Sequence, residues 1–282
     1  MFSYESGLYN ELYFVRQYFY SGSYSKLFEI DASSMSEGGK ELTEIYFARA
    51  KRIQGASLEE IKACMTVDTP GTRAMLAYAG EGDLSSIVAE HGSSDGAVQV
   101  LGALSLIQDG QLQVAYGLLE QAEENLEAVA LQVYICLAQG DITAAETLVH
   151  SALDWTDEEI VLQIAHAWVK LARGGYEAYN DVFYVFEEIS SSSASAFTRN
   201  YLAIADLCLC RAEDAVAHVE NNANIDEGDN AVQAAVTSAN AAVAGQHTGK
   251  QRGPASCSLA SVQKALALKS AEFDALCESF AA

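Results

Sequence analysis

Two stretches of this chain share one pattern: DGQLQVAYGLLEQA at residues 109–122 and QGDITAAETLVHSA at residues 139–152. Five positions match at identical spacing, Gly110, Leu112, Ala115, Leu119 and Ala122 in the first stretch and Gly140, Ile142, Ala145, Val149 and Ala152 in the second. The aliphatic residues continue one stripe at helical period, and the small alanines let that helix lie close against a neighbour. The pattern therefore predicts a repeated helical unit.

The glycine of each stretch marks where one helix ends, because a left-handed residue closes a helix and glycine adopts that conformation without strain. Similar turns stand at Gly22, Gly55, Gly82, Gly110, Gly140 and Gly174, at intervals of 27 to 34 residues. The interval and the small residues resemble the tetratricopeptide repeat, a helical hairpin of about 34 residues. We expect hairpins at 8–31, 40–65, 71–91, 96–122, 126–153, 157–189, 197–220 and 230–268, and a terminal helix from Lys269.

The fold class that follows is all-α, a tetratricopeptide-like solenoid of about eight hairpins and a terminal helix in a right-handed superhelix. Residues 1–282 form one domain, in which 245–256 is expected to be a flexible loop and 269–282 a capping helix. Ser190 to Ser195 is expected to be a serine-rich joint. Since each unit buries its apolar face against its neighbours, the sequence predicts a concave binding surface without an enzyme-style central pocket.

Composition agrees with this class and excludes several functions. Half of the residues are hydrophobic, and the only prolines are Pro70 and Pro254, so long helices are possible. A net charge of -23 disfavours binding to nucleic acid or directly to anionic lipid. The first basic residue is Arg16, and no apolar stretch reaches the roughly 20 residues that span a bilayer, so we expect a cytoplasmic protein without membrane insertion.

Three segments resemble the epsilon subunit family of coatomer, the COPI vesicle coat. They are NELYFVRQYFYSGSY at 10–24, the region 157–188 with QIAHAWVKLA at 163–172 and DVFYVFEE at 181–188, and KSAEFDAL at 269–276. The three follow one another in the family's order, so the resemblance spans the chain. It is weakest after residue 209, where Cys210-Arg211-Ala212 replaces a glycine turn and residues 221–255 offer little to align.

The resemblance implies a coat subunit that is not an enzyme and holds no cofactor or metal. It implies binding to the C-terminal region of the alpha subunit, which the helical hook partly surrounds and stabilises, and indirect contact with other coat subunits. It also implies retrograde Golgi-to-endoplasmic-reticulum and intra-Golgi transport, with the chain peripheral on Golgi membranes and vesicles through the coat.

Five residues are candidates for partner binding: Tyr9, Arg16, Phe19, Arg49 and Arg52. Residues 9–24 hold seven aromatics, more than one helix can bury on a single face, although most of them are expected in the core. Aligned on Gly22 and Gly55, the three arginines fall at positions that face the groove in tetratricopeptide proteins. They would suit an acidic or carbonyl-rich segment, while solvated or locally paired arginines are an equally good interpretation.

Catalytic and metal-binding patterns are not found in the sequence. Cys208 and Cys210 point about 200° apart on a predicted helix and are interpreted as core thiols. No two histidines have zinc-helix spacing, and Asp157-Glu158-Glu159 is interpreted as the first turn of a helix capped by Thr156. Two alternatives stay open: another tetratricopeptide adaptor such as a co-chaperone, and an all-helical enzyme with an unrecognised site.

Overall fold

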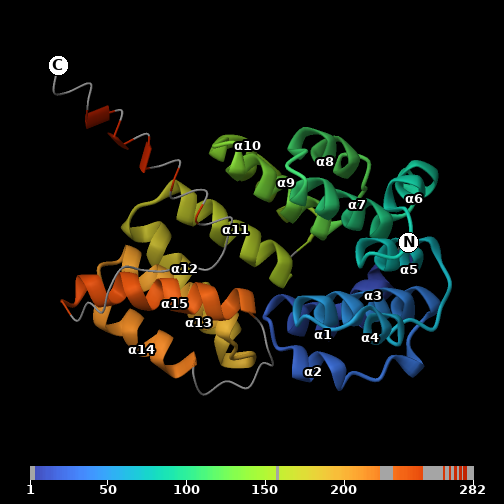
Figure 1. Ribbon diagram of the computed structural model, residues 1–282, viewed down its shortest axis with the longest axis horizontal. Helices are drawn as coiled ribbons and strands as arrows, with labels where there is room; N and C mark the ends of the chain where they lie inside the picture. Colours follow the sequence, from blue (N-terminus) through green and yellow to red (C-terminus); the bar gives the residue numbers. More distant parts are fainter. Residues whose placement is uncertain are drawn as a thin grey trace.

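The computed structural model describes residues 4–156, 159–222 and 231–249, with side chains from Asn10 to Asn221 and from Val232 on. Near the C-terminus it also describes Gln263, Ala267, Ser270, Ala271, Phe273, Asp274, Leu276 and Cys277. The described ranges up to 249 form helices and no strands (Figure 1). The helices are α1 Tyr4–Tyr20, α2 Tyr24–Phe28, η1 Ala32–Ser34, α3 Glu37–Ile53, α4 Leu58–Lys62, α5 Pro70–Tyr78, α6 Leu84–His91, α7 Gly96–Gln108, α8 Leu112–Leu119, α9 Leu126–Ala138, α10 Ile142–Leu153, α11 Ile160–Arg173, α12 Tyr176–Ser192, α13 Ala196–Cys208, α14 Ala212–Asn222 and α15 Ala231–His247.

The helices form a solenoid of hairpins, as the repeat predicts. The first seven predicted hairpins each correspond to one consecutive pair, from α1 and α2 to α13 and α14. Up to α11 the odd-numbered helices pack on one another in series, and each even-numbered helix packs on the odd-numbered helix before it. The odd-numbered helices therefore form an inner row. After α11 the order changes, because α13 packs on α12 and not closely on α11, the odd-numbered helix before it.

The C-terminal predictions fall partly outside the described residues. Helix α15 begins the eighth predicted hairpin. The predicted loop at 245–256 begins later than expected, because α15 continues to His247, and only Thr248 and Gly249 of the remainder are described. Six residues of the predicted capping helix at 269–282 are described, and all six are helical and exposed. A capping role for this segment stays a prediction.

The hairpin turns are closed by left-handed residues. All six glycines that the repeat singles out have positive φ, from +77° at Gly110 to +109° at Gly82. The seventh hairpin has no glycine at this point, and Cys210 takes the left-handed conformation instead, with φ +60°. A cysteine there is strained relative to glycine, because its Cβ crowds the following carbonyl. The repeat thus continues through the region where the family resemblance is weakest.

Replacement by alanine is expected to have opposite effects on stability at two glycines of one hairpin. Replacing Gly110 by alanine should lower the free energy of unfolding by about 1–2 kcal/mol, because alanine is disfavoured at φ +77°. Replacing Gly117 inside α8 should raise it by about 0.5–1 kcal/mol, since alanine favours a helix. A methyl group added at either position would meet no atom of a neighbouring element within 4 Å, so crowding does not contribute. Urea unfolding of both variants measures the contrast, and equal effects would contradict it.

The structure differs from two expectations, the core position of two cysteines and the length of the serine-rich joint. Cys208 and Cys210 are exposed rather than in the core, because they lie at the end of α13 and in the turn that follows it. The expected serine joint is shorter than predicted, since α12 continues to Ser192. Ser193 and Ser195 are fully buried.

The serines are buried because the solenoid curls until its first hairpin meets the sixth and seventh. Helix α1 contacts α11, and the Ser195 hydroxyl donates a hydrogen bond to the carbonyl of Ser21. Gln17 Nε2 lies 3.4 Å from Ser192 Oγ, and the turn at Gly22 packs on Phe197. In Figure 1 the blue first hairpin accordingly lies beside the orange helices of the C-terminal half. The inner row of helices is therefore bent round a central space.

Candidate partner-binding surface

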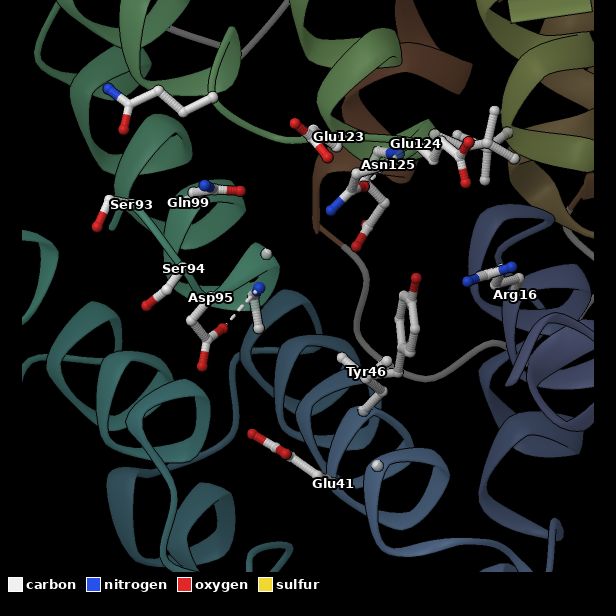
Figure 2. A pocket seen from close by; sticks show the side chains of 18 residues that line it. Arg16, Glu41, Tyr46, Ser93, Ser94, Asp95, Gln99, Glu123, Glu124 and Asn125 are labelled. Carbon is white, nitrogen blue, oxygen red and sulfur yellow. Dashed lines mark hydrogen bonds between the residues drawn. The ribbon is translucent and has the colours of Figure 1, made fainter. Parts of the chain in front are cut away.

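Two adjacent cavities lie on the concave side of the solenoid. The polar cavity, of about 650 Å³, is lined by α1, α3, α7, α9 and α11 and by the loops before α7 and α9 (Figure 2). The apolar cavity, of about 330 Å³, is lined mainly by α1, α3, α9, α11, α13 and α15. Val161 lines both. Contacts between distant hairpins deepen the predicted concave surface into these two half-open cavities.

The wall of the polar cavity carries five carboxylates: Glu41, Asp95, Glu123, Glu124 and Glu127. Asp95 precedes α7 and accepts hydrogen bonds from the backbone N–H groups of Ala97 and Val98, as an N-cap does. Figure 2 shows Asp95 and Glu41 on one side of the opening and Glu123 and Glu124 on the other. The wall is therefore acidic on both sides.

Glu127 forms the central ion pair of the concave side. Arg49 Nη1 lies 2.7 Å from Glu127 Oε1, and the Tyr20 hydroxyl donates to the same oxygen. The Arg49 guanidinium also lies 4.8 Å from the ring centre of Phe19 and 5.3 Å from that of Tyr46. Burial raises the pKa of Glu127 to about 7, while the nearby Arg16 acts in the opposite direction. The ion pair joins α3 and α9 across the groove, and the Tyr20 hydroxyl adds α1.

The structure brings three of the five predicted residues together. Arg16 lines the polar cavity, where its guanidinium lies 3.8 Å from Glu159, and Phe19 lines the apolar cavity. Arg49 is on the same side, but only 12% of its side chain is exposed. Arg52 lies apart, 4.1 Å above the ring of Tyr78. Tyr9 is in α1, and its side chain is outside the described part.

Several lining residues were missed at the sequence level. Trp168 of α11 lines the apolar cavity, and its indole N–H donates to the Tyr201 hydroxyl at 2.9 Å. An aromatic residue beside the buried stripe of an inner helix was the available signal for Trp168. Glu159 was interpreted as part of a capped first turn, yet its side chain makes no cap hydrogen bond and pairs with Arg16. The first-turn interpretation is therefore wrong for Glu159, because α11 begins at Ile160 and Glu159 itself stands at the N-cap position.

The described residues were compared with the requirements of a metal site and of a membrane-spanning helix. No group of three or more His, Cys, Asp or Glu side chains among them is arranged to hold a metal ion. None of the helices in these ranges is long and apolar enough to cross a membrane.

Comparison with known proteins decides the family. The family model described as coatomer epsilon subunit matches residues 8–281. The chain belongs to this family. It is also 56% identical over 220 residues to a protein of Schizosaccharomyces pombe named probable coatomer subunit epsilon, covering 78% of this chain and 76% of that protein. Membership confirms the resemblance and favours a coatomer component over the co-chaperone and enzyme alternatives.

Proposed function

We propose that this chain is a non-enzymatic subunit of the COPI coat that binds and stabilises the C-terminal region of the alpha subunit. Through that partner it contacts the other coat subunits. It acts in retrograde Golgi-to-endoplasmic-reticulum and intra-Golgi transport, as a cytoplasmic protein that is peripheral on Golgi membranes and COPI vesicles.

The concave side with its two adjacent cavities is the observation that carries this proposal. The two cavities are lined by helices of the first, second, fourth, fifth and sixth hairpins and of the C-terminal half, so a segment seated there would touch most of the solenoid. A partner bound to the folded chain alone stabilises it by mass action. Mutual stabilisation of two coat subunits is the expected consequence.

The candidate contacts are Phe19 and Trp168 in the apolar cavity and Arg16 in the polar cavity. Aromatic and arginine side chains are enriched where binding energy concentrates. Arg49, in the central ion pair of the concave side, and Arg52, which lies apart from both cavities, are retained as proposed contacts. Tyr9 is retained as a proposed contact because it belongs to the aromatic N-terminal helix.

Purification from native cytosol under gentle conditions tests the proposal. An affinity-tagged chain should recover the large coat subunits, led by the alpha subunit, as identified by mass spectrometry. Deleting the aromatic-rich segment 1–65 should abolish this recovery, because α1 and α3 line both cavities. Recovery of chaperones in place of coat subunits would contradict the proposal.

A further inference from the structure

The turn of the seventh hairpin has a thiol where the earlier turns have a glycine. The Cys210 N–H donates to the carbonyl of Leu207 at 3.1 Å. The next N–H, that of Arg211, donates to the carbonyl of Asp206 at 2.8 Å. This pair of hydrogen bonds is the Schellman motif that closes a helix. The same pair closes the first helix of each of the first five hairpins, where the left-handed residue is in turn Gly22, Gly55, Gly80, Gly110 and Gly140.

Cysteine is not the residue that this turn favours. The φ of +60° at Cys210 costs a residue with a Cβ atom free energy that glycine avoids. Among the described residues, Glu124 is the only other non-glycine residue with a positive φ. Strained residues of this kind cluster at functional sites, because elsewhere an unstrained residue serves equally well. The thiol at this point therefore needs a reason other than the turn itself.

A second thiol lies two residues before Cys210. Cys208 is the last residue of α13, and both cysteines are exposed. Leu209 between them has nearly helical backbone angles, φ -84° and ψ 4°, which place the two cysteine Cα atoms about 5.5 Å apart. A disulfide spans Cα separations of roughly 4.4–6.8 Å. The separation of the two Cα atoms therefore suits a disulfide.

The two thiols also influence each other electrostatically. Burial raises the pKa of Cys208, and the neighbouring Cys210 thiol raises it further. A raised pKa leaves less thiolate at neutral pH, so Cys208 suits the second step of an oxidation better than the first. Thiols two residues apart on a continuous helix would point about 200° apart, but the left-handed conformation of Cys210 ends the helix before it. The divergence expected from the sequence therefore does not apply to this turn.

We propose that Cys208 and Cys210 form a redox-sensitive dithiol, which a hydroperoxide converts to a disulfide within the turn. This modification site goes beyond the proposed function and holds whichever partner occupies the concave side. A disulfide across one intervening residue is strained, and strained, exposed disulfides are readily reduced again. The site therefore suits a reversible modification rather than a permanent cross-link.

The oxidation proceeds in two balanced steps. The Cys210 thiolate attacks one oxygen of hydrogen peroxide, the O–O bond breaks, and a sulfenic acid forms while the leaving hydroxide takes up a proton as water. The Cys208 thiolate then attacks the sulfur of the sulfenic acid, so that the S–S bond forms, the S–O bond breaks, and the hydroxide again leaves as water. Two thiols and one hydrogen peroxide thus give one disulfide and two waters, with the sulfur atoms oxidised and the peroxide oxygens reduced.

Peptide mapping of the full-length chain tests the proposal. The fully reduced chain is divided, one half is treated with hydrogen peroxide, and both halves are blocked with N-ethylmaleimide and cleaved with trypsin. Cleavage after Arg199 and Arg211 releases residues 200–211, which contain both thiols and no other cysteine. After peroxide this peptide should carry no maleimide and be lighter than the unblocked reduced peptide by two hydrogen atoms, and reduction before blocking should restore both maleimides. Residues 63–73 contain Cys64 alone and are the internal control, which should keep its one maleimide.

Two maleimides on residues 200–211 after peroxide would overturn the proposal, and so would a disulfide from either thiol to another cysteine or another chain. Sulfinic or sulfonic acids at both positions without a disulfide would overturn it as well. Cys208→Ser removes the second step, so dimedone should then trap Cys210 as a sulfenic acid, and no dimedone adduct would refute the order of the steps. Cys210→Gly should prevent the disulfide and raise the midpoint of urea unfolding, because glycine fits the left-handed turn. A lower midpoint would show that the turn itself requires the cysteine and would remove the reason for assigning it a redox role.

Discussion

Replacing Phe186 by alanine is expected to lower the free energy of unfolding by about 3–5 kcal/mol. Phe186 is fully buried in α12 and stacks on Tyr201, with ring centres 4.4 Å apart and planes 9° apart. It belongs to the cluster that joins the fifth, sixth and seventh hairpins, where helix order changes. Its removal leaves a cavity that the flanking helices cannot fill. Urea unfolding followed by circular dichroism measures the loss.

Tyr184, two residues earlier in the same helix, is the matched control. Its side chain is 58% exposed, so Tyr184→Ala should change the free energy of unfolding by no more than about 0.5 kcal/mol. A loss for Phe186→Ala below about 1 kcal/mol would mean that α12 and α13 do not share a tightly packed core.

Replacing Arg49 by methionine is expected to cost about 3 kcal/mol, because it leaves Glu127 in the groove without its cation. The double variant Arg49→Met/Glu127→Leu should recover most of this loss, since two apolar side chains need no counter-charge. The pair of Arg173 and Glu146, in which the arginine is exposed, is a control, and Arg173→Met should cost less than about 1 kcal/mol. Equal losses in the single and double variants would contradict the pairing.

Lower pH should reduce the defect of the Arg49→Met variant. The pKa of Glu127 is raised from 4.5 to about 7 in the folded chain, so the folded state binds a proton that the unfolded state releases between these values. The contribution of Glu127 to the free energy of unfolding is complete below about pH 4.5 and is lost as the pH rises through about 7. The difference in free energy of unfolding between Arg49→Met and the double variant should therefore be smaller at about pH 5.5 than at about pH 7.5. A difference that does not change with pH would contradict the raised pKa of Glu127.

The hairpins could be predicted from the sequence, because the glycine turns and the alanine positions are local signals. Gly110 and Gly140 close their helices as expected, and Ala115 and Ala145 are fully buried between helices. Local periodicity reports which face of a helix is apolar and where the chain turns. It therefore gives the order of the helices and the inner and outer rows.

The closure of the groove could not be predicted, because it depends on contacts between residues far apart in the chain. Arg49 and Glu127 are 78 positions apart, and Ser21 and Ser195 are 174 apart. A small change in the rotation between successive hairpins decides whether such residues meet, and no single hairpin encodes that angle. For the same reason the sequence could not show that Arg16 and Arg49 pair with distant carboxylates or that the cavity beside them is acidic.

The binding of the alpha subunit to a chain with a filled groove tests the central claim most directly. Ala130 of α9 lines the apolar cavity, so Ala130→Trp adds bulk there without removing a buried contact. Gln113→Trp on the exposed side of α8 is the matched control. With both variants folded, we expect the alpha subunit to bind wild type and Gln113→Trp alike and Ala130→Trp at least about a hundredfold more weakly. Undiminished binding to Ala130→Trp would contradict the concave side as the binding surface.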